Sequence, residues 1–203
     1  MGELVEGRIE LRPRGTKRCG WAQTDPVLMD YHDNEWGVPV HDDRKLFEFL
    51  VLEGAQAGLN WLTILKKRDA FRAAFEEFDP RKVARFSNAD VRRLLANKEI
   101  IRNRLKISAS VTNARQLISV QEEEGSFNDY VWKFVGGRPI EHRFRSMSSI
   151  PAKSRESNRM SNELRRRGFK FVGSTICYAF MQATGMVNDH VTNCFRYSEV
   201  SNA

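Results

Sequence analysis

Apolar residues recur along this chain at the three- and four-residue spacing of amphipathic helices. After Asp43, the side chains of Leu46, Phe47, Leu50 and Val51 fall on one face of such a helix. Further segments with the same period contain Leu62, Leu65, Phe71, Phe75, Ile107, Val111, Ala114, Leu117, Ile118, Ile176, Phe180 and Met181. Alternation with a period of two is nearly absent, so the pattern predicts an all-α protein.

Residues that favour helix ends stand at the edges of these segments. Expected starts are Asn60, Asp79 with Pro80, Asn88 and Ser126, and expected stops are Gly125, Gly136 with Gly137, Gly168 and Gly185. One helix is expected over residues 174–184, with Ile176, Phe180 and Met181 buried. The stretch 144–162 is rich in Ser, Arg and Met, and is expected to be a loop that leads into a short basic helix.

The first residues of the chain lack this helical pattern. Residues 1–16 are polar and charged, and are expected to be a flexible arm or an expression remnant. No internal repeat is present in the remainder. Residues 17–203 are therefore predicted to form a single domain built of two interleaved helical lobes.

Charge and cysteine content narrow the class of protein. The chain has 203 residues, with 33 Lys and Arg against 26 Asp and Glu, and a formal charge of +7. This charge favours a polyanionic partner without requiring one. Three cysteines without an apolar leader favour metal or thiol chemistry over a disulfide framework. No apolar run approaches the roughly 20 residues of a membrane span, so a soluble cytoplasmic protein without a membrane partner is expected.

Two cysteines and two histidines form a candidate metal site. Cys19 and His32 lie near the start of the predicted domain, whereas His190 and Cys194 lie near its end. If Asn188 caps a helix, His190 and Cys194 project from one face and can bind one ion. Two sulfurs and two imidazoles suit a tetrahedral structural zinc site. The alternative is a polar surface histidine and a small buried cysteine, which the spacing alone leaves open.

The other cysteine and histidines are given no chemical role. Cys177 stands between Ile176 and Tyr178 and is expected in the core. His41 and His142 stand in polar turns.

Large rings and one carboxylate suggest a binding pocket. Trp21, Tyr31, Trp36 and Trp61 can stack on a flipped purine, and Glu53 can accept from its exocyclic amine. A cationic alkylated base would also gain from ring faces and negative charge. The alternative is that the tryptophans are core residues and Glu53 is solvated.

Two glycines and small residues precede an isolated leucine in the segment 54–61. Leu59 follows Gly58 at a predicted turn between helices. Such a leucine is a candidate wedge into DNA.

Several separate motifs resemble those of the 3-methyladenine DNA glycosylase I family over about residues 17–195. They are R-C-G-W at 18–21, Y-H-D-N-E-W-G at 31–37, L-E-G-A-Q-A-G-L-N-W at 52–61, R-G-F-K-F-V-G-S-T-I-C-Y at 167–178 and V-N-D-H-V-T-N-C at 187–194. The resemblance implies an all-helical member of the helix-hairpin-helix glycosylase superfamily. It also implies one structural zinc ion that joins the N- and C-terminal segments, held by Cys19, His32, His190 and Cys194.

The resemblance further implies where substrate binds. Glu53 is the main polar contact of the base, with Trp21, Tyr31 and Trp61 around it. Leu59, Gln56 and Gly58 lie at the gap that the flipped base leaves in the DNA.

The hairpin is expected in the basic turn 98–106, where Arg102 and Arg104 would bind phosphate. The family commonly has glycine where Glu99 and Leu105 stand, which questions the geometry of this turn. Asn60 replaces a more usual serine, and both residues cap helices.

The resulting prediction is a monofunctional glycosylase acting on double-stranded DNA that contains alkylated adenine. Glu53 would select adenine and stabilise the oxocarbenium-like state while water attacks. No lysine nucleophile is required, and a monomer without an obligate protein partner is expected. A non-catalytic, zinc-stabilised module for damaged DNA is the first alternative, for which the basic turn and Arg165–Arg167 would suffice. A zinc hydrolase is the second, but it needs an open position on the metal.

Overall fold

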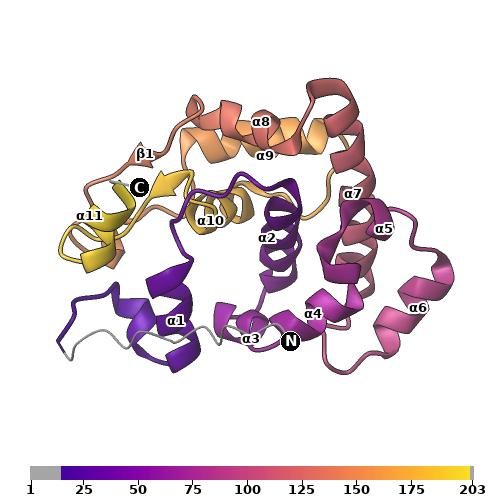
Figure 1. Ribbon diagram of the computed structural model, residues 1–203, viewed down its shortest axis with the longest axis horizontal. Coiled ribbons are helices and arrows are strands. Elements are labelled where there is room, and N and C mark those ends of the chain that lie inside the picture. The colour runs from indigo at the N-terminus through magenta and orange to yellow at the C-terminus, as the bar shows by residue number, and fades with distance from the viewer. Residues whose placement is uncertain (1–14, 202–203) are drawn as a thin grey trace, which may run out of the picture.

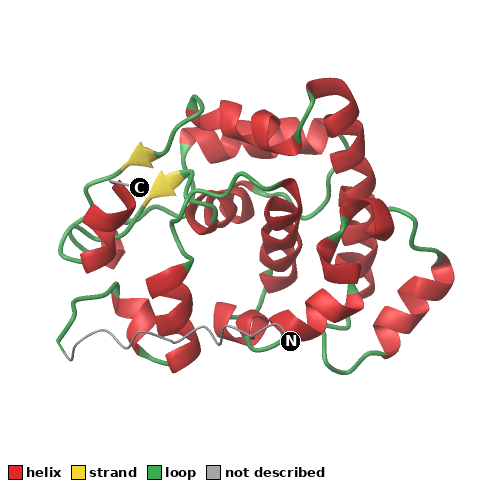
Figure 2. Cartoon of the chain, viewed as in Figure 1, coloured by secondary structure: helices red, strands yellow, loops and turns green. Residues whose placement is uncertain are grey.

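The computed structural model describes residues 15–201, and helices dominate this part of the chain (Figure 2). The helices are α1 (Pro26–Asn34), α2 (Asp43–Gln56), α3 (Trp61–Leu65), α4 (Arg68–Ala74), α5 (Pro80–Val83), α6 (Asn88–Ala96), α7 (Arg104–Glu124), α8 (Phe127–Trp132), α9 (Arg155–Arg166), α10 (Ser174–Ala183) and α11 (Phe195–Ser201). Short 3-10 turns lie at Gly20–Gln23, Glu76–Phe78, Lys133–Val135 and Met147–Ser149. The predicted helical class is confirmed. All of the predicted arm 1–16 except its last two residues lies outside the described residues.

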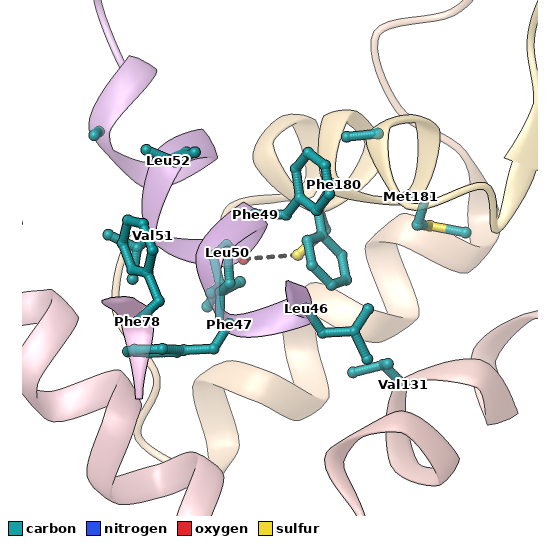
Figure 3. Close-up of a cluster of buried hydrophobic side chains, with 14 of the residues drawn as sticks. Leu46, Phe47, Phe49, Leu50, Val51, Leu52, Phe78, Val131, Phe180 and Met181 are labelled. Carbon is teal, nitrogen blue, oxygen red and sulfur yellow. Dashed lines mark hydrogen bonds between the residues drawn. The ribbon is translucent and has the colours of Figure 1, made fainter. Parts of the chain in front are cut away.

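Helix α2 lies in the middle of the molecule, with α7, α8 and α10 around it (Figure 1). Every residue from Leu46 to Ala55 is buried, so this helix has no solvent-facing side over that length. Phe47 packs edge to face on Phe78, with ring centroids 6.4 Å apart, and Leu46 lies beside Val131 of α8 (Figure 3). Apolar burial of this extent is the main source of folding free energy.

The predicted helix ends are largely confirmed by hydrogen bonds. The side chains of Asn60, Asp79 and Ser126 cap α3, α5 and α8 by accepting from backbone N–H groups. The start at Asn88 was placed one residue late, because the cap is Ser87, which forms a capping box with Asp90.

The helix predicted over 174–184 is present as α10, although Ile176 is only half-buried. The loop predicted from residue 144 is shorter than expected, since α9 already begins at Arg155.

A short parallel strand pair joins two distant segments. Strand β1 (Ile140–Glu141) pairs with β2 (Val187–Asn188), with Ile140 opposite Val187. The prediction that Asn188 caps a helix carrying His190 and Cys194 is therefore wrong. Asn188 donates to Tyr197 and Ser201 instead, and Thr192 N–H donates to the Phe144 carbonyl. These tertiary hydrogen bonds hold residues 189–194 as a turn, and helix α11 begins only at Phe195.

The two ends of the described chain meet. The backbone N–H of Phe195 donates to the Lys17 carbonyl at 3.0 Å. This contact brings the segment before α1 to the start of α11. Among the described helices, none combines the length and apolar character that a membrane span needs.

Candidate functional site

A cavity of about 590 Å³ opens between the N-terminal segment, α2, α3, α10 and the loop that precedes α9. Its lining residues are Trp21, Thr24, Leu28, Tyr31, Trp36, Glu53, Gln56, Asn60, Trp61, Leu62, Met147, Ile150, Pro151, Ala152, Thr175, Tyr178, Ala179 and Gln182. A volume of this size is typical of a small-molecule site.

All four predicted rings line this cavity. Trp21 lies 5.2 Å from Trp36 and 6.2 Å from Tyr31 between ring centroids, and Tyr31 lies 5.5 Å from Trp61. Trp36 is buried, whereas Trp21 and Trp61 are half-buried and keep surface for a ligand. Tyr31 and Trp36 thus belong to the core, whereas Trp21 and Trp61 keep ring surface that a flat molecule in the cavity could contact.

Glu53 is a buried carboxyl group without a partner. It lies in the last turn of α2 and is 4 % exposed. Within the described residues it forms no side-chain hydrogen bond or ion pair. Burial raises its pKa to about 8. The alternative of a solvated Glu53 is therefore wrong, and a buried carboxyl group that lines a cavity is a candidate contact for a ligand.

Two polar groups beside Glu53 also lack partners. The Tyr31 hydroxyl and the Trp61 indole N–H are buried and make no hydrogen bond of good geometry within residues 15–201. Burial, followed by the charge of Glu53, raises the pKa of Tyr31 well above its usual value, so the phenol stays protonated. Both groups can donate a hydrogen bond to a bound molecule.

The four predicted metal-binding residues lie together and are all buried. Their ligand atoms, from Cys19, His32, His190 and Cys194, lie within 4.8 Å of one another. Cys194 Sγ is 3.4 Å from His32 Nε2 and 3.6 Å from His190 Nδ1, and Cys19 Sγ is 3.7 Å from the same His190 atom. This group can hold a metal ion in a tetrahedral arrangement.

In each histidine of this cluster, the ring nitrogen that points away from the cysteines contacts a polar group that fixes the orientation of the ring. His32 Nδ1 lies 2.8 Å from Asp33 Oδ1, and Arg18 in turn binds that carboxylate. His190 Nε2 lies 3.1 Å from the Trp36 carbonyl. Carboxylate and carbonyl partners of this kind leave the opposite nitrogen free for a metal. The residues therefore fit a metal centre.

The turn between α2 and α3 carries the predicted DNA wedge. Leu59 is 42 % exposed and follows Gly58, whose φ of 78° is in the region that favours glycine. Gln56 also lines the cavity. Lys106, at the start of α7, donates to the carbonyls of Ala55 and Ala57 at 2.7 and 2.5 Å. The wedge turn is thereby tied to the basic turn.

The basic turn connects α6 to α7. Arg102 and Arg104 are exposed, and no described residue forms an ion pair with either. Neither Glu99 nor Leu105 has a positive φ, so these residues cause no backbone strain here. Arg166 and Arg167, by contrast, pair with Glu163, Glu123 and Glu124 on helix surfaces.

A second buried carboxylate was missed by sequence reasoning. Asp189 is 1 % exposed and accepts hydrogen bonds from Tyr178 and Gln182, both of which line the cavity, and from His142. His142 therefore has a structural partner that its polar surroundings did not reveal. No local pattern predicts this network, because its members come from α10, the residue after β2 and the loop after β1. Cys177 is buried in the core, as predicted.

Comparisons with known proteins agree on one relationship. The family model described as methyladenine glycosylase matches residues 21–197. The chain is 51 % identical over 181 residues to DNA-3-methyladenine glycosylase 1 of Escherichia coli (strain K12), covering 89 % of this chain and 97 % of that one. It superimposes with a TM-score of 0.86 on a crystal structure of 3-methyladenine DNA glycosylase I, at 52 % identity, covering 88 % of this chain and 98 % of the other. A variant glycosylase I solved in complex with 3-methyladenine gives a TM-score of 0.85 at 35 % identity, covering 88 % and 96 %.

Proposed function

This chain belongs to the methyladenine glycosylase family, and we propose that its ring-lined cavity binds a 3-methyladenine base flipped out of DNA. The chain is a base-excision repair glycosylase of the DNA-3-methyladenine type. The observation that carries the site assignment is the unpartnered, buried carboxyl group of Glu53 among aromatic rings.

Base recognition combines stacking with one carboxyl group. Trp21, Tyr31 and Trp61 offer ring faces to the base, and these faces attract its positive charge. Burial disfavours the charged form of Glu53 while the cavity is empty. A cationic base would supply the missing counter-charge and favour the carboxylate. An ion pair between the Glu53 carboxylate and the base would therefore form with the cationic alkylated base and not with neutral adenine.

Hydrolysis needs little acid catalysis, because methylation at N3 already makes the base a good leaving group. The bond between the base nitrogen and C1′ breaks and leaves an oxocarbenium-like sugar, which the Glu53 carboxylate stabilises. A water oxygen then bonds to C1′ and loses a proton, which yields an abasic site. No lysine lines the cavity among the described residues. A monofunctional enzyme without a covalent sugar intermediate follows, and borohydride trapping of a protein–DNA adduct would contradict it.

On the DNA side, Leu59 would fill the gap left by the flipped base, with Gln56 and Gly58 beside it. The exposed Arg102 and Arg104 would bind phosphates of double-stranded DNA without reading sequence. Helices α6 and α7 with their connecting turn would then serve as the helix-hairpin-helix element. A single two-lobed domain acting as a monomer suffices for this arrangement.

Cys19, His32, His190 and Cys194 would hold one zinc ion. Bound there, the ion supplies structural cross-linking only, because four protein ligands leave no open coordination position. Cys19 and His32 precede α2, whereas His190 and Cys194 follow α10, so these ligands would join the two ends of the domain around the cavity. The contribution to folding would be several kcal/mol.

The deciding experiment measures release of 3-methyladenine from methylated duplex DNA, with metal content determined on the same samples. Glu53→Gln keeps the shape of the side chain and removes its charge. We expect DNA binding within about threefold of wild type and a rate reduced at least a hundredfold, as for loss of a transition-state contact. Glu48→Gln is the matched control, since Glu48 is buried on the same helix but pairs with Arg68 away from the cavity lining. Equal rates for wild type and Glu53→Gln would favour the non-catalytic DNA-binding module.

A further inference from the structure

The buried Asp189 carboxylate accepts hydrogen bonds from two side chains of α10 that line the cavity. Asp189 Oδ2 accepts from the Tyr178 hydroxyl at 2.7 Å and from Gln182 Nε2 at 2.7 Å, and its Oδ1 lies 2.6 Å from His142 Nδ1. Tyr178 and Gln182 are four residues apart on one face of α10, and both line the cavity. Neither side chain can turn without leaving a buried carboxylate short of a donor.

This arrangement sets which end of the Gln182 amide meets Asp189. A carboxylate only accepts hydrogen bonds, so it must face the NH₂ group and not the carbonyl oxygen. The carbonyl oxygen of the side chain accepts no hydrogen bond from any residue between 15 and 201. The backbone of Gln182 is also held, because its carbonyl accepts from the Gly37 N–H at 3.1 Å. Gln182 thus presents one acceptor whose polarity an amide flip cannot reverse.

Glu53 does not have this constraint. It has no partner within the described residues, and burial raises its pKa to about 8. A carboxyl group accepts hydrogen bonds when ionised and donates one when protonated. Glu53 can therefore satisfy either an amine or a carbonyl on the edge of a purine. Discrimination between these two groups needs a second residue of fixed polarity.

We propose that Gln182 is a specificity-determining residue whose side-chain oxygen accepts from the exocyclic amine of the methylated adenine. The inference rests on the proposed function of the cavity. The amine has two N–H groups, which can serve Gln182 and Glu53 together. A 6-oxo purine would instead place its carbonyl oxygen against the Gln182 oxygen, and two acceptors cannot satisfy each other. Asp189 acts through Gln182 as a positioning residue.

The test compares two free bases by calorimetry on the metal-loaded, full-length protein. These are 3-methyladenine and 3-methylhypoxanthine, in which a carbonyl replaces the amine. Gln182→Met keeps the length of the side chain and removes the acceptor. Ser174→Ala is the matched control, because Ser174 lies on the same helix but neither lines the cavity nor contacts Asp189. Metal content and thermal unfolding of each variant establish that it is folded.

We expect wild type and Ser174→Ala to prefer 3-methyladenine at least tenfold. Gln182→Met should bind 3-methyladenine about tenfold more weakly and bind the oxo base unchanged or more tightly, so that the preference is lost. In excision from DNA, kcat should fall about tenfold with little change in KM. A preference that survives in Gln182→Met, or an equal loss for both bases, overturns the assignment and leaves a packing role. Failure of the wild type to bind either base would count against the proposed function itself.

Discussion

The imidazole Nε2 of His190 lies 3.1 Å from the backbone carbonyl of Trp36, whose indole lines the cavity. The same two rings are packed edge to face with centroids 4.6 Å apart. A residue of the candidate metal site thus contacts a residue of the cavity wall. The stability of the cluster and the shape of the base-binding site should therefore be coupled.

Loss of one metal ligand should lower both the stability of the fold and the affinity of the cavity for the base. Cys194→Ser is expected to lower metal content well below one per chain and to destabilise the fold by several kcal/mol. Because Trp36 loses its fixed neighbour, affinity for 3-methyladenine should fall as well. Elemental analysis, thermal unfolding and calorimetry measure the three effects. Cys177→Ala is the control, since Cys177 is buried outside the cluster, and it should keep its metal. Full metal content in Cys194→Ser would remove that residue from the ligand set.

Glu53 should make stability fall with rising pH. Its pKa is about 8 in the folded chain against an ordinary value of 4.5, so the folded state binds more protons between these values. The free energy of unfolding then decreases as pH rises from 4.5 to 8, by at most about 1.4 kcal/mol per pH unit. Glu53→Gln removes this loss. The variant should match wild type near pH 4.5 and be more stable at pH 8, as measured by denaturant unfolding.

Glu48→Gln provides the opposite case on the same helix. Burial opposes ionisation of Glu48, but its ion pairs with Arg68, Lys45 and Arg72 outweigh this and lower its pKa. A lowered pKa stabilises the fold above the unfolded value and loses that contribution on acidification. Glu48→Gln should therefore be destabilised by about 3 kcal/mol at pH 7, with a smaller deficit at pH 4. Parallel pH profiles for the two variants would refute the assigned environments.

Leu59 should matter for duplex DNA and not for folding. Its side chain is 42 % exposed, so Leu59→Ala should change stability by less than about 0.5 kcal/mol. Without the leucine side chain, nothing fills the space that the flipped base leaves in the duplex, so the flipped-out state is less stable. Base release from duplex DNA should therefore slow about tenfold. Release from single-stranded DNA, which needs no unpairing, should change little. An equal effect on both substrates would speak against a wedge.

Lys106 should act on the position of the wedge turn and not on phosphate. Its ammonium donates to the carbonyls of Ala55 and Ala57, just before Leu59. Lys106→Met should reduce kcat on duplex DNA several-fold and leave the salt dependence of binding unchanged. Arg102→Ala should lower the slope of log affinity against log salt by about one. A lowered slope in Lys106→Met would mean that this lysine contacts phosphate.

Local sequence signals determined much of this protein. The helical period placed α2, α7 and α10, and the caps at Asn60, Asp79 and Ser126 are formed by residues within three positions of their partners. Such signals depend on contacts within one helical turn, so they survive without knowledge of the fold. The chemistry of two cysteines and two histidines indicated the four residues that the structure brings together, and motif resemblance added the family.

Only the tertiary structure decided how distant segments meet. His190 and Cys194 lie in a turn because β2 pairs with β1 and Asn188 bonds to α11, and no local pattern contains those partners. Burial without a partner raised the pKa of Glu53, whereas Glu48, five residues earlier on α2, is paired. The amide of Gln182 is oriented by Asp189, from a different element. Hydrophobic period and helix caps are short-range properties, but burial, pairing and polarity at a site arise from contacts that only the folded chain creates.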